Sequence, residues 1–98
     1  MLPDTVIYDI NNYFKQLPVE KAWLFGSYAR NEETENSDID ILVTFTKPNN
    51  ISLMKFIMII QNLEVLSNKK IDLVVEGTAR KLIAQEIEKE KKLIYERN

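Results

Sequence analysis

The run Ile39–Phe45, with the sequence IDILVTF, is the segment that most constrains the fold of this chain. β-Branched and aromatic residues dominate it, and such residues favour a strand. Two other short runs of the same kind, Lys21–Phe25 and Ile71–Val75, predict two more strands. The cluster KPNN at residues 47–50 is typical of a turn. The chain is therefore expected to build a small sheet.

The segments between these strands have the periodicity of helices. Residues 4–17 place apolar side chains at helical spacing, and Pro18 is expected to end that helix. Ser52 is suited to cap a second helix, which reaches about Leu66 and is apolar on more than one face. The polar segment 28–36 is expected to begin with one or two helical turns and to continue as a loop.

The last part of the chain, residues 79–97, is expected to form a charged helix. Its glutamates and lysines interleave at spacings that suit pairing along a helix surface. A narrow apolar stripe follows it, made of Leu82 or Ile83, Ile87 and Ile94. This helix is interpreted as a solvated face, with a partner surface as the alternative. Tyr95 is assigned no role.

In chain order these elements read helix, strand, short helix, strand, helix, strand, helix. This order predicts an α/β (α+β) fold, a small sandwich in which a short mixed sheet packs with about four helices. A length of 98 residues favours one domain, covering residues 1–98.

The composition excludes several kinds of chemistry. The chain has no cysteine, which removes disulfides, thiolate metal sites and cysteine nucleophiles. It also has no histidine, which removes a Ser-His-Asp triad and histidine-ligated zinc. Acids, bases and metal ligands must therefore come from carboxylate, lysine, tyrosine or hydroxyl groups.

The charge pattern and the apolar runs restrict the partners. A formal net charge of −2 without a dense basic block disfavours long nucleic acids, which bind mainly through their phosphates. The longest apolar run, around Phe56–Ile60, is too short to span a bilayer. The first residues lack the pattern of a secretory signal. The expected location is the cytoplasm.

Two aspartates at the start of the central strand are the first candidate site. Residues two apart on a strand point to the same face, so Asp38 and Asp40 are expected to converge while Ile39, Ile41 and Val43 are buried on the other side. Carboxylates this close raise each other's proton affinity unless a cation lies between them. Hard oxygen ligands of this kind suit magnesium or manganese.

Asp72 is the candidate for a third carboxylate. It lies in the strand KIDLVV between Ile71 and Leu73, where an unpaired buried acid would cost several kcal/mol. Facing a metal would offset that cost, and a two-metal site could stabilise both oxygens of an in-line phosphoryl displacement. The alternative is an ordinary aspartate on the wet face of a short strand.

The segment that precedes the two aspartates contains three residues that suit the binding of a triphosphate. Gly26 would allow the backbone to approach a phosphate closely, and Ser27 would offer hydroxyl and amide donors. Arg30 could neutralise part of the phosphate charge. Two alternatives remain: Ser27 as a plain helix cap, and Arg30 as a solvated ion pair with a neighbouring glutamate.

The runs GSYARN, SDIDILV and IDLVV together resemble the minimal nucleotidyltransferases of the DNA polymerase β-like superfamily. The resemblance covers nearly the whole chain. It implies that Gly26 and Ser27 bind a nucleoside triphosphate, that Asp38 and Asp40 bind magnesium, and that Asp72 is the third, catalytic carboxylate. The family usually has glycine after the arginine, where this chain has Asn31. Asparagine tolerates the left-handed backbone that a glycine there suggests.

Many of these enzymes are antitoxins that pair with HEPN-domain toxins. The resemblance therefore implies transfer of a nucleoside monophosphate, AMP from ATP, to a hydroxyl on a partner toxin, where in related antitoxins the acceptor is a tyrosine. Two alternatives stay open: a binding module that neutralises a toxin by contact alone, and a regulatory domain that senses ATP without turnover. The apolar faces of the helix after Ser52 and of the last helix leave room for a homo- or hetero-oligomer.

Overall fold

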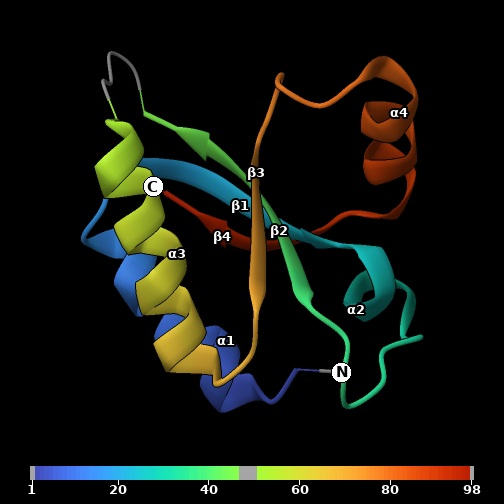
Figure 1. The fold of residues 1–98 in the computed structure, drawn as a ribbon, viewed down its shortest axis with the longest axis horizontal. Coiled ribbons are helices and arrows are strands. Elements are labelled where there is room, and N and C mark those ends of the chain that lie inside the picture. Colours follow the sequence, from blue (N-terminus) through green and yellow to red (C-terminus); the bar gives the residue numbers. More distant parts are fainter. Residues whose placement is uncertain (1, 47–50, 98) are drawn as a thin grey trace.

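The computed structural model describes residues 2–46 and 51–97, and the predicted turn at 47–50 lies outside them. Its eight elements alternate between helix and strand from one end to the other (Figure 1). In chain order they are α1 (Asp4–Lys15), β1 (Val19–Phe25), α2 (Gly26–Arg30), β2 (Ile39–Phe45), α3 (Leu53–Ser67), β3 (Ile71–Val75), α4 (Lys81–Glu90) and β4 (Lys92–Glu96).

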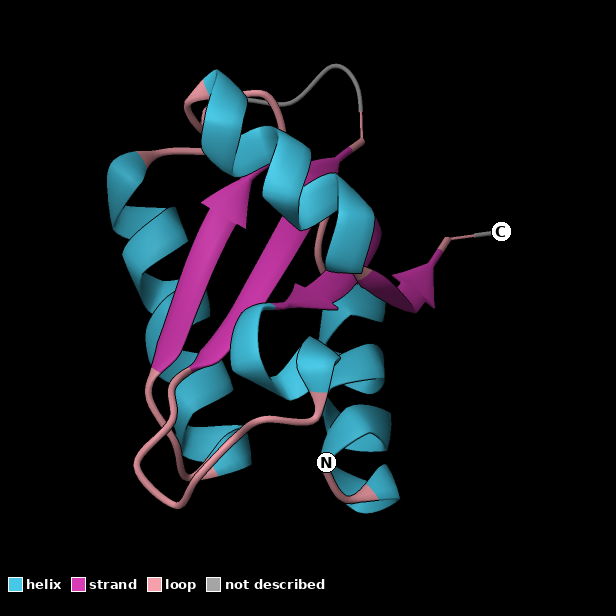
Figure 2. Cartoon of the chain, turned by 90° about the vertical axis from the view of Figure 1, so that its right-hand side faces the viewer, coloured by secondary structure: helices cyan, strands magenta, loops and turns pink. Residues whose placement is uncertain are grey.

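The four strands form one mixed sheet in the order β3-β2-β1-β4. β2 and β3 run parallel, with α3 as the crossover between them, and β1 is antiparallel to both β2 and β4. Helices α1 and α3 lie on one side of the sheet, and α2 and α4 lie on the other (Figures 1 and 2). The predicted fold class, a short mixed sheet packed with four helices, is confirmed.

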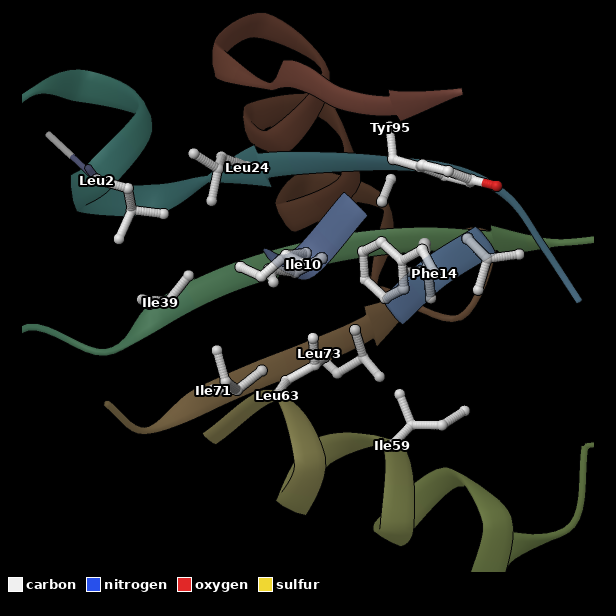
Figure 3. Close-up of a cluster of buried hydrophobic side chains, with 14 of the residues drawn as sticks. Leu2, Ile10, Phe14, Leu24, Ile39, Ile59, Leu63, Ile71, Leu73 and Tyr95 are labelled. Atoms are coloured by element: carbon white, nitrogen blue, oxygen red, sulfur yellow. The ribbon is translucent and has the colours of Figure 1, made fainter. Parts of the chain in front are cut away.

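The core lies between the sheet and the pair α1 and α3 (Figure 3). Ile39, Ile41 and Val43 are fully buried there, as their alternation along the strand predicts. Phe14 of α1 and Leu63 of α3 are also fully buried and close the core from the helix side. The helix caps follow the sequence as well, since the Ser52 hydroxyl accepts a hydrogen bond of 3.1 Å from the Lys55 amide.

The prediction of one helix from residue 79 to 97 is wrong in its second half. Helix α4 ends at Glu90, and Lys91 has an extended backbone with a ψ of 143°. The following residues pair with β1 as the edge strand β4, because β1 would otherwise expose a row of unpaired backbone groups. Ile94 therefore belongs to a strand and not to the predicted helical stripe.

Tyr95 is the residue that anchors this added strand. The residue is 5% exposed, and the centroid of its ring lies 5.7 Å from that of Phe14. Arg97 extends the attachment, since its amide donates to the Glu20 carbonyl at 2.8 Å. Tyr95 is thus part of the core, where the sequence suggested no role.

The packing of Tyr95 gives a testable prediction. Tyr95→Ala should lower the free energy of unfolding by about 3–4 kcal/mol, because it leaves a cavity against Phe14. Tyr95→Phe keeps the ring and should cost less than about 1.5 kcal/mol. Leu93 lies on the same strand but is 51% exposed, so Leu93→Ala serves as the control with an expected cost below about 1 kcal/mol. Urea unfolding measures all three, and equal losses for Tyr95→Ala and Leu93→Ala would contradict the assignment.

Candidate active site

The turn from β1 into α2 brings its backbone against the carboxylate of Asp40. Gly26 has a φ of +71°, a left-handed conformation that side chains disfavour. A Cβ atom at this position would also lie 2.0 Å from Asp40 Oδ2. Glycine is therefore required here by conformation and by contact. At the other end of α2, Asn31 has a φ of 59° and a ψ of 36°, the left-handed position expected for it.

Asp40 and Asp72 are direct neighbours across the parallel strands β2 and β3. Their Cα atoms are partners in the strand register, so both side chains leave the sheet on the same face, away from the core. Asp38 lies two residues before Asp40, just ahead of the strand. Asp38 and Asp72 are exposed, and Asp40 is half-buried. The structure thus brings the three predicted carboxylates to one end of the sheet.

The electrostatics of this end centre on Asp40. Partial burial, the negative charges of Asp72 and Asp38, a hydrogen bond with Asp72 and the charge of Glu90 raise the pKa of Asp40 from its ordinary value of 3.8 to about 6. The charged groups that raise this pKa are all acidic, and a divalent cation bound among them would reduce their mutual repulsion.

The residues present fit magnesium by the chemistry of their donors. Carboxylate oxygens are the ligands that hard divalent cations prefer, and Asp38 and Asp40 would hold the ion with Asp72 beside them. Within residues 2–46 and 51–97, however, no three acidic side chains already enclose a single metal position. The site is a cluster of three carboxylates near the start of β2 and β3, and metal binding would need their side chains to converge.

The raised pKa of Asp40 makes a prediction about the metal-free protein. Between about pH 4 and pH 6 the folded state binds this proton more tightly than the unfolded state, so the free energy of unfolding falls as the pH rises through that window. Asp40→Asn removes the penalty. In magnesium-free buffer the variant should be more stable than the parent by on the order of 1–2 kcal/mol at pH 7.5, after allowance for the partial exposure of the group.

Urea unfolding of both proteins at pH 4 and pH 7.5 measures this effect. The difference should become small at pH 4, because most of the effect develops between the ordinary pKa of 3.8 and the folded-state pKa of about 6. A stability difference that does not change with pH would contradict the proposed crowding of charge.

Ser27 and Arg30 lie on α2, one turn apart. Helix α2 has no side-chain cap, so the Ser27 hydroxyl is not used as the plain cap that the sequence also allowed. Arg30 forms two ion pairs: its Nε atom donates to Glu32 Oε1 at 2.9 Å, and its Nη1 atom donates to Glu90 Oε2 at 2.9 Å. The pair with Glu32 is the solvated ion pair that the sequence left open as the alternative role of Arg30.

Glu90 is a further residue at this turn, which the sequence pattern did not indicate. Its Oε2 atom accepts a short hydrogen bond from the Gly26 amide, in addition to the bonds from Arg30. The helix containing it was interpreted as a solvated face. One signal was present: Glu90 follows Ile87 by three residues, and Ile87 is the buried residue of α4, so both lie on the inward face.

The sequence matches a described family over most of its length. The family named Polymerase beta, Nucleotidyltransferase matches residues 8–98. Protein adenylyltransferase MntA of Thermococcus cleftensis is 40% identical over 72 residues, which cover 74% of this chain and 71% of MntA. MJ0126 of Methanocaldococcus jannaschii is 47% identical over 60 residues, which cover 61% of this chain and 59% of MJ0126. The aligned region thus spans about three fifths of that relative.

Solved structures share the fold. A chain in the crystal structure of a toxin–antitoxin with AMP-PNP matches with a TM-score of 0.77 and 22% identity, covering 99% of this chain and 76% of the other. A Shewanella oneidensis structure of a tri-AMPylated HEPN toxin in complex with an MNT antitoxin matches with a TM-score of 0.65 and 22% identity, covering 94% and 73%. The family match over residues 8–98 and the 40% sequence identity to MntA show that this chain belongs to the polymerase β-type nucleotidyltransferase family.

Proposed function

We propose that this chain is a magnesium-dependent nucleotidyltransferase that moves AMP from ATP to a hydroxyl group on a partner protein. The observation that carries the proposal is the register of β2 and β3, which places Asp40 beside Asp72 on one face. The turn at Gly26 lies in contact with Asp40, so donors for phosphate and carboxylates for metal meet at one point. Membership of the nucleotidyltransferase family supports this assignment.

In the proposed complex, the turn and α2 hold the triphosphate. Ser27 offers its hydroxyl and its backbone amide, since neither is used for a helix cap. Gly26 allows the backbone to lie close to a phosphate, and the guanidinium of Arg30 supplies a positive charge that pairs with it. The structure of a toxin–antitoxin with AMP-PNP, which shares this fold, supports a nucleoside triphosphate as the donor.

The carboxylates divide into two roles. Asp38 and Asp40 would hold magnesium, which supplies neutralisation of the charge that develops on the phosphates. Asp72, on the adjacent strand, would accept the proton of the incoming hydroxyl and orient its oxygen. A bond then forms between that oxygen and the α-phosphorus, and the bond from the α-phosphorus to the bridging oxygen breaks. Pyrophosphate leaves with that electron pair.

A protein acceptor is supported by the relatives and by the surface. MntA is named a protein adenylyltransferase, and the Shewanella oneidensis complex holds an AMPylated HEPN toxin. We therefore propose a HEPN-type toxin as the partner and a side-chain hydroxyl on it as the acceptor. Helix α3 exposes large apolar side chains that suit contact with a protein: Leu53, Met54, Ile57, Met58, Val65 and Leu66.

No helix in the described part of the chain is both long enough and apolar enough to cross a membrane.

The test is incubation with ATP labelled on the α-phosphate, magnesium and the product of the neighbouring gene. Label should appear on the partner polypeptide and should disappear when Asp38 and Asp40 are both replaced by asparagine. Absence of label, with tight complex formation retained in the double variant, would indicate a module that neutralises by contact alone. Magnesium-dependent ATP binding without label would indicate a nucleotide sensor.

A further inference from the structure

Glu90 reaches from the end of α4 to the turn between β1 and α2. Its carboxylate accepts hydrogen bonds from the Gly26 amide and, at 3.1 and 2.9 Å, from Arg30 Nη1. Its side chain is 17% exposed, whereas those of Glu86 and Glu88 on the same helix are 70% exposed. Glu90 is therefore held at the turn, while its neighbours extend into solvent.

The two residues that Glu90 engages, Gly26 and Arg30, are among those proposed to bind the triphosphate. A carboxylate and a phosphate are alike to these donors, because both are anions that accept from amides and pair with a guanidinium. They are also mutually repulsive, and a triphosphate adds several negative charges at the same place. Gly26 offers a single N–H, which cannot serve both anions at full strength.

We infer that Glu90 is an internal competitor of the nucleotide: in the free protein it occupies the Gly26 amide and Arg30, and it leaves them when the triphosphate binds. This inference rests on the proposed function and goes beyond it, since it assigns to α4 the control of nucleotide affinity.

The attachment of α4 permits such a release. Ile87 is its buried residue, whereas Leu82 and Ile83 in its first turn are 76% and 53% exposed. Glu90 is also the last residue of the helix, directly before the extended Lys91 that leads into β4. A change of the Glu90 rotamer, or a small shift of the helix end, frees both donors without loss of the core.

An alternative role for Glu90 predicts the opposite change in nucleotide affinity. If Glu90 stayed in place to orient Arg30 for the phosphate, removing its charge would weaken nucleotide binding. Glu90→Gln keeps the size and the ability to accept a hydrogen bond and removes the charge. Glu86→Gln is the matched control, because it makes the same change of net charge one turn earlier on the same helix, where Glu86 pairs with Lys89 at 3.7 Å.

The experiment is calorimetric titration of the full chain and both variants with AMP-PNP and with inorganic tripolyphosphate, each with magnesium. Glu90→Gln should bind both ligands about tenfold more tightly, which corresponds to ~1.4 kcal/mol. Glu86→Gln should stay within about twofold of the parent, as expected for a screened surface charge. Equal or weaker binding by Glu90→Gln overturns the inference and leaves the proposed function intact. If the parent and Glu90→Gln bind neither ligand, both the function and the inference fail.

A second measurement follows the contact itself. The chain has two glycines, Gly26 and Gly77, so labelling with ¹⁵N-glycine gives two amide signals, and Gly77→Asn assigns them. Without nucleotide, the Gly26 signal should differ between the parent and Glu90→Gln. At saturation with magnesium and AMP-PNP, the two Gly26 signals should coincide, because Glu90 has left. Signals that coincide without nucleotide, or that remain apart at saturation, overturn the inference.

Discussion

Asp72→Asn should reduce AMP transfer by about 10³-fold while changing nucleotide affinity by less than about tenfold. The lost group is the proposed proton acceptor, and general base catalysis contributes typically 10²–10⁴ in rate. Asp72 is exposed beside Asp40, so its replacement leaves Asp38, Asp40 and the turn at Gly26 in place. Nucleotide binding should therefore survive.

Asp40→Asn should have a different effect. Asp40 is the carboxylate that contacts the turn and lies next to the other two acids, so its loss removes the centre of the proposed metal site. Magnesium-dependent binding of AMP-PNP should fall by about 100-fold or more, and transfer should fall with it. Titration calorimetry and transfer of labelled AMP separate the two variants.

The control is Asp9→Asn, an exposed aspartate on α1, which packs on the opposite side of the sheet. It should change neither binding nor transfer by more than about twofold. Normal transfer by Asp72→Asn would show that the third carboxylate has been misassigned. Equal loss of binding in Asp40→Asn and Asp72→Asn would show that all three acids act as one metal site.

The pairing of Asp40 with Asp72 could be predicted because the two strands carry the same pattern. The tripeptides Ile39–Ile41 and Ile71–Leu73 both place an aspartate between two apolar residues. The apolar residues must face the same core, so both aspartates are forced to the other face. Burial alone thus fixes the side of the sheet on which the acids lie, and the parallel register then makes them neighbours.

Strand β4 and the contact of Glu90 could not be predicted in this way. The charges before and within Lys92–Glu96 fit the spacing of a helix, and local pattern gives no reason to end it. The deciding interaction is the open edge of β1, where Ala22 pairs with Tyr95 although the two residues lie far apart in the sequence. The hydrogen bond from Gly26 to Glu90 likewise joins residues 64 apart. Both depend on tertiary pairing, which the local spacing does not encode.

Gly26→Ala should damage both the fold and the site. A φ of +71° costs a side-chain-bearing residue about 1–2 kcal/mol. The new Cβ would also lie 2.0 Å from Asp40 Oδ2 and 3.0 Å from Asp40 Cγ, so the carboxylate has to move. We expect a total loss of about 3 kcal/mol in the free energy of unfolding, with nucleotide affinity reduced by about 100-fold.

Gly77→Ala separates the two causes. Gly77 also has a positive φ, +91°, but a Cβ there would meet no atom within 4 Å. Its replacement therefore shows the backbone cost alone, about 1–2 kcal/mol, with nucleotide binding unchanged. Urea unfolding and titration with magnesium and AMP-PNP give both quantities for both variants. The contrary result is that Gly26→Ala loses no more stability than Gly77→Ala and still binds nucleotide. That result would show that the position of the Asp40 carboxylate does not require glycine at residue 26. The greater loss is expected at Gly26 because its backbone lies against the carboxylate of Asp40, whereas the space around Gly77 is open.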